Sequence, residues 1–244
     1  MHNFKKEIGA IIYSRMMSKR FPNKAVYNLC GKSLLERVIS KTKLIKGVSK
    51  IILATSDLPV DDDICKVAHR NNIYFYRGSH LNVYQRTTDI LHKFQLDYFL
   101  RICGDRPLLD PYLHDLAIKQ TLKNNLDLCT TLNPKILPAG LTVEVLSSKS
   151  FLNVNSSTIE KYDMEHITNR YYNSLNLHNI KNINLPKSIN WKSKKNISYT
   201  FDKKEDIDFL EFNINNLNNV TFGIKYHLKL QNLALKWDKI KNKD

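Results

Sequence analysis

The sequence predicts an α/β protein with a mostly parallel central sheet. Apolar runs of strand length alternate with segments whose apolar residues recur at helical spacing, and this alternation implies strands joined by right-handed crossovers. The chain of 244 residues is long enough for one large domain. It contains no internal repeat and no low-complexity linker. We therefore predict a single domain over residues 1–244.

Four apolar runs in the first half of the chain are predicted to be strands. The first reads "IGAII", and the fourth, "YFLRICGD", ends in a glycine and an aspartate. Both are typical of strands buried inside a sheet. The four predicted strands lie at residues 8–12, 50–57, 73–78 and 98–105.

Helices are predicted between these strands. Residues 33–45 carry apolar side chains at helical spacing, and so do residues 82–94. Three aspartates at 61–63 lie at the start of another predicted helix, where their charge suits the helix dipole. Asp110 is a predicted N-cap, with Pro111 at the first helical position, which gives a fourth helix a strong start signal.

The second half of the chain is less regular. Residues 126–132 and 141–147 are predicted strands, and residues 160–174 are a predicted helix. Residues 197–201 are predicted to form a further strand, followed by a turn at Asp202 and then a helix.

Composition narrows the class of protein. No apolar run is long enough to cross a membrane, and "MHNFKKEIGA" lacks the apolar core of a signal peptide. The four cysteines are widely spaced without a CxxC pair, so we expect a cytoplasmic protein with reduced thiols and no membrane insertion. The formal net charge of +15 comes from scattered lysines that are not gathered with aromatic residues. This pattern favours a solvated basic surface over a nucleic-acid interface, and it is compatible with attraction of polyanionic small molecules.

The loop at residues 14–24 follows the first predicted strand and contains four cations, Arg15, Lys19, Arg20 and Lys24. Loops at the carboxyl ends of parallel strands form the ligand crevice of such sheets. The loop contains no glycine and lacks the GxxxxGK[ST] pattern of a P-loop. Two interpretations remain: a solvated basic loop, or a site where side chains hold a phosphate chain in place of backbone amides.

An aspartate after the fourth strand is a candidate metal ligand. Asp105 follows Gly104, and Mg²⁺ prefers one or two carboxylates combined with phosphate oxygens and water. Asp202 is the best candidate for a second carboxylate, with a turn or cap residue as the alternative. His166 lacks the spacing of a zinc site, and Cys103 lacks an evident base, so the residues alone favour structural roles for both.

Several stretches, in this order, resemble the cytidylyltransferases that activate acidic sugars. The resemblance is to the acylneuraminate and 3-deoxy-manno-octulosonate types, and in particular to the spore-coat polysaccharide biosynthesis, SpsF-like branch. It covers about residues 8–210. The stretches that carry it are "IIYSRMMSKRFPNKAV", "GKSLLERVI", "IILATSDLPVDD", "YFYRGS", "LRICGDRPLLDP", "GLTVEVLS", "MEHIT" and "FDKKEDIDFL".

The resemblance implies a fold, a reaction and an assembly. The fold would be a Rossmann-like nucleotidyltransferase three-layer sandwich of the nucleotide-diphospho-sugar transferase type. The reaction would use Mg²⁺ to move CMP from CTP to an acidic or phosphorylated sugar, with release of pyrophosphate, in the synthesis of surface polysaccharide or glycan precursors. Relatives of this kind are commonly homodimers, and the segment that meets the partner and the acceptor would lie within residues 132–175.

The resemblance also implies roles for individual residues. The catalytic residues would be Arg15, Lys24 and Asp105. The metal ligands would be Asp105 and Asp202. The acceptor would be bound by Glu144, Glu165 and His166. The nucleotide would be bound by Arg15, Ser18, Lys19, Arg20, Lys24, Arg77 and Arg86.

The chain departs from the family pattern at four positions. One is Thr142 in "GLTVEV", where relatives of the same branch tend to have aspartate. The family loop usually has glycine where this chain has Met17 and Asn23, and asparagine is the milder replacement because it tolerates left-handed backbone. Cys103 stands where the sialate and octulosonate types have a glutamine that contacts the base. Three alternatives therefore stay open: a nucleotidyltransferase that uses another base, a related glycosyltransferase, and a non-catalytic nucleotide- or RNA-binding protein.

Overall fold

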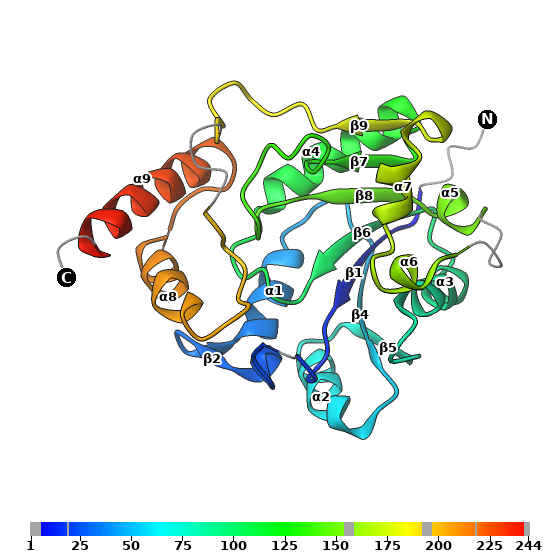
Figure 1. Cartoon of the computed structure of the whole chain (residues 1–244), viewed down its shortest axis with the longest axis horizontal. Coiled ribbons are helices and arrows are strands. Elements are labelled where there is room, and N and C mark those ends of the chain that lie inside the picture. Colours follow the sequence, from blue (N-terminus) through cyan, green and yellow to red (C-terminus); the bar gives the residue numbers. More distant parts are fainter. Residues whose placement is uncertain (1–5, 19, 154–158, 192–196, 218, 242–244) are drawn as a thin grey trace.

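A seven-stranded, mostly parallel sheet with helices on both faces forms the centre of the molecule, which confirms the predicted class (Figure 1). The structure is a computed structural model, and it describes residues 6–18, 20–153, 159–191, 197–217 and 219–241. In sheet order the strands are β5 (Tyr74–Gly78), β4 (Lys50–Ser56), β1 (Ile8–Tyr13), β6 (Tyr98–Cys103), β8 (Glu144–Ser147), β7 (Leu128–Thr130) and β9 (Ile180–Asn182). β8 runs antiparallel to both of its neighbours, whereas the pairs on either side of it are parallel. A short hairpin, β2 (Asn28–Leu29) and β3 (Lys32–Ser33), lies outside this sheet.

The helices form two layers. α1 (Leu34–Thr42), α2 (Asp62–Arg70), α4 (Pro111–Asn124), α8 (Asp206–Asn216) and α9 (Ile224–Lys241) contribute to the core on one face of the sheet. α3 (Val83–Phe94), α5 (Ser148–Leu152) and α7 (Asn169–Asn173) contribute to the core on the other face, and α6 (Lys161–Glu165) lies against α3. No helix in the described ranges is long and apolar enough to span a membrane.

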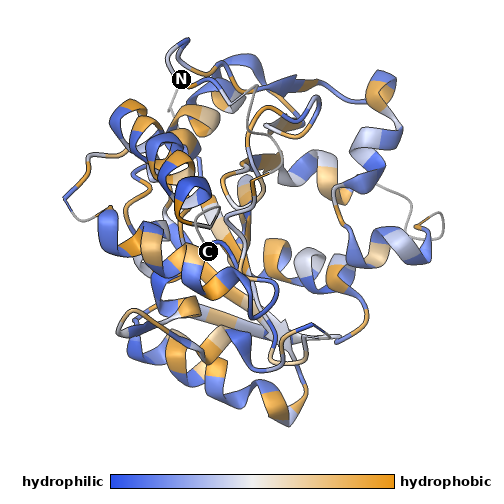
Figure 2. Ribbon diagram, turned by 60° about the vertical axis from the view of Figure 1, so that its left-hand side comes forward, coloured by the Kyte–Doolittle hydropathy of each residue, from blue (hydrophilic) through white to orange (hydrophobic). Residues whose placement is uncertain are grey.

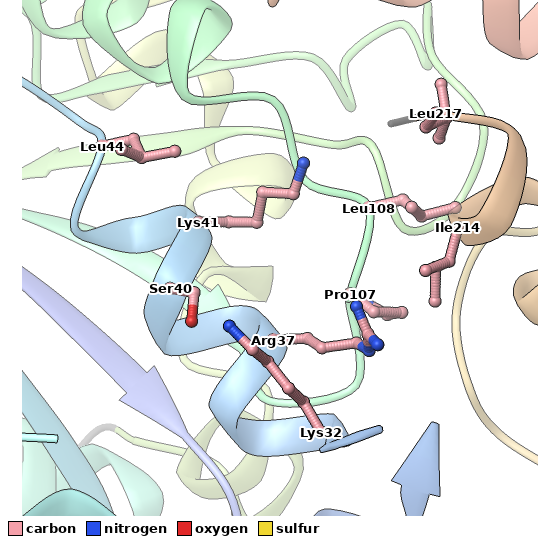
Figure 3. Close-up of a pocket in the computed structure, with 9 residues that line it drawn as sticks. All are labelled: Lys32, Arg37, Ser40, Lys41, Leu44, Pro107, Leu108, Ile214 and Leu217. Carbon is pink, nitrogen blue, oxygen red and sulfur yellow. The ribbon is translucent and has the colours of Figure 1, made fainter. Parts of the chain in front are cut away.

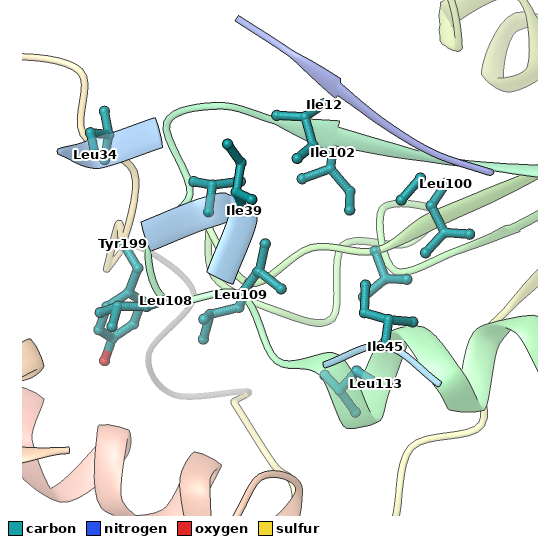
Figure 4. Packing of buried hydrophobic residues seen from close by; sticks show 14 of the residues in the cluster. Ile12, Leu34, Ile39, Ile45, Leu100, Ile102, Leu108, Leu109, Leu113 and Tyr199 are labelled. Atoms are coloured by element: carbon teal, nitrogen blue, oxygen red, sulfur yellow. The ribbon is translucent and has the colours of Figure 1, made fainter. Parts of the chain in front are cut away.

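Burial of apolar side chains explains these layers. Ile12, Leu100 and Ile102 extend from β1 and β6 and pack with Ile39 of α1 and Leu113 of α4, as Figure 4 shows. In Figure 2 hydrophobic and hydrophilic segments alternate along the outer helices, as expected for helices with one apolar face. Burial of apolar side chains on both faces therefore stabilises the sheet, and the site lies at the carboxyl ends of its strands.

Local capping contacts mark the starts of two predicted helices. Asp110 caps α4, because its carboxylate accepts a hydrogen bond of 2.9 Å from the backbone N–H of Tyr112. At α1, Ser33 and Glu36 form a reciprocal capping box. Both helices begin where the sequence predicts.

Two predictions for the second half were wrong in detail. The helix predicted at residues 160–174 is broken into α6 and α7, since the chain turns at His166 to bury Ile167 and the β-branched Thr168. The strand predicted at 197–201 lies outside the sheet. It runs beside two loops instead, and Ser198 pairs with Ala139 in an isolated bridge.

Candidate active site

The candidate site lies at the carboxyl ends of β1 and β6, which the sheet places side by side. The backbone N–H of Gly104 donates to the carbonyl of Tyr13 over 2.8 Å, so the turn after β6 lies against the start of the cationic loop. A Cβ at position 104 would lie 2.8 Å from the Cβ of Ser14 and 3.0 Å from the Tyr13 oxygen. Only glycine fits this approach, and it brings Asp105 to the end of β1.

A buried aspartate holds the cationic loop. Asp61 is 1% exposed, and its carboxylate accepts hydrogen bonds from the Met16 N–H at 2.8 Å and from the Thr55 hydroxyl at 2.8 Å. The backbone N–H and the hydroxyl of Ser56 donate to the same carboxylate. Burial raises the pKa of Asp61, but these hydrogen bonds outweigh burial and hold the pKa below its usual value.

The placement of Asp61 corrects the sequence interpretation of the aspartates at 61–63. The Asp61 side chain makes no capping hydrogen bond to α2 and points toward the loop instead. Sequence reasoning missed this role because the contact with Met16 spans 45 residues.

The loop folds without glycine. Asn23 has φ of 60° and ψ of 15°, which is the left-handed conformation that asparagine tolerates, as predicted. Met17 has no positive φ, so its replacement of glycine introduces no strain of that kind. The ring of Phe21 packs 5.2 Å from Phe201 and 5.6 Å from Tyr27, measured between ring centroids. These rings fasten the loop to the segment that precedes Asp202.

Two cations of this loop and two carboxylates from elsewhere in the chain converge. The Lys24 Nζ lies 3.0 Å from Asp105 Oδ2 and 3.2 Å from Asp202 Oδ1. The Arg20 Nη2 lies 2.8 Å from the same Asp202 oxygen. The Lys24 side chain is 14% exposed, so this ion pairing is partly shielded from water. The structure thus brings together four of the predicted site residues.

Backbone contacts explain why Asp202 reaches Asp105. The N–H of Phe201 donates to the Asp105 carbonyl over 2.9 Å, and the N–H of Tyr199 donates to the Ala139 carbonyl over 2.9 Å. Gly140, with φ of +86°, allows this approach, because a Cβ there would lie 2.4 Å from the Tyr199 carbonyl carbon. The segment before Asp202 is therefore fixed along its backbone.

The carboxylate pair is suited to a divalent cation. Asp105 and Asp202 both direct an oxygen at a single positive charge, the Lys24 ammonium. Within the described ranges there is no cluster of three or more His, Cys, Asp or Glu residues with metal-site geometry. A pair of carboxylates fits Mg²⁺, which completes its coordination with phosphate oxygens and water.

A second ion pair crosses from the cationic loop to α6. The Arg15 Nη2 lies 3.0 Å from Glu165 Oε1, and the two side chains are 37% and 55% exposed. His166 follows Glu165 at the exposed end of α6, and its ring centroid lies 4.4 Å from that of Tyr162. Arg15 and Glu165 therefore meet at this rim of the site, and His166 is the next residue along the chain.

The remaining predicted nucleotide-binding residues lie in different surroundings. Ser18 accepts the Phe21 N–H over 3.4 Å, and Lys19 lies outside the described residues. Arg77 donates to the Ser56 and Leu58 carbonyls and to Asp62, which commits its guanidinium to the loop after β4.

Arg86 is buried beside the cationic loop. Its Nη1 donates to the Ser79 carbonyl over 3.2 Å, and its pKa is lowered chiefly by burial. The nearby charge of Arg15 lowers the pKa further, whereas Tyr13 opposes the shift. Arg86 therefore adds positive charge behind the loop.

Glu144 belongs to a separate buried cluster. Its fully buried carboxylate accepts hydrogen bonds of 2.8 Å from Arg101 Nη1 and 2.8 Å from the Tyr172 hydroxyl. Burial raises the pKa of Glu144, but the charges of Arg101 and Arg106 outweigh burial and hold it below its usual value. The Arg101 side chain is 19% exposed. Sequence reasoning missed Arg101, although an arginine inside the apolar run "YFLRIC" was a signal.

The sequence of the chain is similar to that of a known protein family. A model of the family described as "Cytidylyltransferase" matches residues 9–235. The spore coat polysaccharide biosynthesis protein SpsF of Bacillus subtilis is 25% identical over 210 residues, which is 84% of this chain and 85% of its own.

Two solved structures share the fold. A cytidylyltransferase from Leptospira borgpetersenii superposes with a TM-score of 0.84 at 22% identity, covering 96% of each chain. CMP:2-keto-3-deoxy-manno-octonic acid synthetase, solved in complex with CTP, superposes with a TM-score of 0.62 at 14% identity, covering 84% of this chain and 97% of its own. These likenesses confirm the predicted nucleotidyltransferase fold.

Proposed function

Because the chain belongs to the cytidylyltransferase family, and is therefore a nucleotidyltransferase enzyme, we propose that it moves CMP from CTP to an acidic or phosphorylated sugar. The observation that carries this proposal is the convergence of Lys24, Asp105 and Asp202 at the carboxyl edge of the sheet. The choice of substrates is supported by the octonic acid synthetase, whose structure contains CTP.

The proposed reaction is a direct displacement. An oxygen of the acceptor sugar attacks the α-phosphorus of CTP, and the bond from that phosphorus to the oxygen that bridges it to the β-phosphorus breaks. Where the attacking oxygen belongs to a hydroxyl, its proton passes to solvent. Pyrophosphate leaves with the bonding electron pair, and CMP remains on the acceptor. The reaction needs no covalent enzyme intermediate.

Side-chain cations bind the triphosphate in this proposal. Several backbone N–H groups of the loop already donate within the protein, among them those of Met16, Ser18 and Asn23. Arg15, Arg20 and Lys24 therefore supply the positive field, and each charge-assisted hydrogen bond contributes about 1.5–3 kcal/mol. Lys24 and Arg15 also stabilise the charge that develops on the transition state and on the departing pyrophosphate.

Asp105 and Asp202 are the proposed ligands of Mg²⁺. The bound ion would neutralise charge on the non-bridging phosphate oxygens. Lys24, which lies between the two carboxylates, orients them toward one point and balances their charge. Thr200 supports the arrangement by donating its hydroxyl to Asp202 over 3.1 Å.

The acceptor is proposed to bind between the rim formed by Glu165 and His166 and the buried cluster of Glu144. Since the Glu144 carboxylate is fully buried, it is proposed to act through Arg101, whose side chain is 19% exposed and whose guanidinium suits a carboxylate or phosphate of the acceptor. Glu144 is thus a positioning residue in this proposal.

The cellular setting is also a proposal. Similarity to SpsF supports a role in the synthesis of surface polysaccharide precursors, and four free cysteines agree with a cytoplasmic enzyme. We expect a homodimer whose contacts include part of residues 132–175, where Tyr162 is 59% exposed.

A pyrophosphate-release screen tests the function. The purified protein is incubated with Mg²⁺, each of four nucleoside triphosphates, and a panel of acidic and phosphorylated sugars. We expect release that requires both CTP and one class of sugar. Preference for another triphosphate would contradict the base assignment. In a parallel assay with nucleotide sugars as donors, release of free nucleoside diphosphate would indicate glycosyl transfer. Salt-sensitive binding of polynucleotide without any turnover would overturn the enzyme proposal.

A further inference from the structure

A cavity of about 220 Å³ lies between α1, the turn at Pro107 and Leu108, and the end of α8 (Figure 3). We call it the α1 pocket. None of the residues assigned above to nucleotide, metal or acceptor lines it. Its turn begins two residues after Asp105.

Three cations line the α1 pocket, and no acidic residue does. Lys32, Arg37 and Lys41 form no ion pair with any residue in the described part of the chain. Two nitrogens of the Arg37 guanidinium donate hydrogen bonds to the Leu29 and Cys30 carbonyls, which hold the guanidinium at the β2–β3 hairpin. The pocket is therefore lined by positive charge, and the nearby carboxylates of Glu211 and Asp110 act on Arg37 and Lys41 without forming an ion pair with them.

Lys41 lies over aromatic rings and not against a carboxylate. Its Nζ lies over the rings of Phe222 and Tyr226, at 4.3 Å and 5.1 Å from their centroids. It makes no hydrogen bond to any residue that the structure describes. Burial lowers its pKa to about 8, although the charge of Asp110 partly opposes that shift. A cation withdrawn from water in this way gains from an anionic partner.

The far side of the α1 pocket is apolar. Figure 3 shows Arg37 and Lys41 extending from α1 toward the turn of Pro107 and Leu108, with Ile214 and Leu217 of the α8 end beyond it. Burial of a ligand's apolar part against these side chains adds to binding. Cations on one side and apolar groups on the other favour a ligand that has both an anionic group and an apolar body.

We propose that the α1 pocket binds a small organic anion. The carboxylate or phosphate of the ligand lies against the Lys41 ammonium and the Arg37 guanidinium, and its apolar body lies against Leu108 and Ile214. The site is separate from the triphosphate site, and the proposal does not depend on the CTP reaction.

Calorimetry on the full chain tests this proposal, with phenyl phosphate and phenylacetate as probes and benzyl alcohol as the uncharged control. Saturating CTP with Mg²⁺ is present to occupy the nucleotide site. We expect at least one anionic probe to bind, and benzyl alcohol to bind at least about tenfold more weakly, because a hydrogen bond to a charged group is lost.

Matched variants locate the binding. Lys41→Met keeps the side-chain stem and should weaken the anionic probe about tenfold or more, whereas Lys46→Met, an exposed lysine near the same helix, should leave it unchanged. If Lys41→Met does not fold, Ile214→Glu, which adds a carboxylate to the pocket, should produce the same loss. The same titration is repeated without CTP. Absence of binding by both anionic probes, equal binding by wild type and Lys41→Met, or probe binding that occurs only when CTP is omitted would overturn the proposal.

Discussion

The Lys24 ammonium lies 3.0 Å from the Asp105 carboxylate, although 81 residues separate the two in the chain. The contact is possible because β1 and β6 are adjacent parallel strands, and each residue follows the carboxyl end of one of them. Asp202 reaches the same ammonium from the other end of the chain. One lysine therefore joins the loop proposed to hold phosphate to both proposed metal ligands.

Replacement of this lysine should damage catalysis far more than folding. We predict that Lys24→Ala lowers kcat/KM for CTP about a hundredfold or more, or about 3 kcal/mol of transition-state stabilisation. Pyrophosphate release measures the effect, and Lys66→Ala, an exposed lysine of α2, is the control. Turnover of Lys24→Ala at the wild-type rate would remove Lys24 from the mechanism.

Glu165 should compete with the triphosphate of the nucleotide for Arg15. If Arg15 binds the triphosphate, Glu165→Gln frees it, and CTP should bind up to about fivefold more tightly, since exposed pairs contribute about 0.2–1 kcal/mol. Calorimetric titration with CTP checks this prediction. Weaker CTP binding by Glu165→Gln would show that Glu165 assists the nucleotide site.

Asp61 should make stability depend on pH. Its folded pKa lies below the unfolded value of about 3.9, so its contribution is complete above that value and is lost as the pH falls through the folded pKa. Asp61→Asn should cost about 1–3 kcal/mol at pH 7, because buried donors lose a charged acceptor. The difference in unfolding free energy between wild type and Asp61→Asn should become smaller below about pH 4.

Urea unfolding at a series of pH values measures this effect, with Asp208→Asn, an exposed aspartate of α8, as the control. A constant difference between wild type and Asp61→Asn from pH 7 to pH 3 would contradict the assignment.

The buried pair of Glu144 and Arg101 should show strong coupling. Glu144→Leu leaves Arg101 without its carboxylate and should cost about 3 kcal/mol of unfolding free energy. Adding Arg101→Met removes the uncompensated charge and should restore much of that loss. Denaturant unfolding of the two single variants and the double variant measures the coupling. Losses of unfolding free energy in the two single variants that add up to the loss in the double variant would contradict the coupling.

The sequence predicted the elements whose signals are local. Asp110 and Pro111 mark the start of α4. The four apolar runs of the first half lie where the structure has β1, β4, β5 and β6. Tyr226, Leu230 and Leu233 carried a comparable helical spacing for α9, but it was missed among the lysines of that segment.

Long-range contacts were harder to predict. Asp202 was the best candidate for a second carboxylate beside Asp105, and the family resemblance implied the same pair. The hydrogen bond from Phe201 to the Asp105 carbonyl, which brings the two together, leaves no local pattern. The inward turn of Asp61 and the pairing of Arg101 with Glu144 were not predicted for the same reason. In the sequence alone, charged residues of this kind cannot be told from surface residues, because their partners lie far away along the chain.

The most direct test is the effect of Mg²⁺ on CTP affinity in wild type, Asp105→Asn and Asp202→Asn, measured by calorimetry. The two aspartates are proposed to hold, together, the metal that accompanies the triphosphate. Mg²⁺ should raise the affinity of wild type about tenfold or more, and it should have little effect on either variant. A Mg²⁺ effect of wild-type size in both variants would contradict the shared metal site.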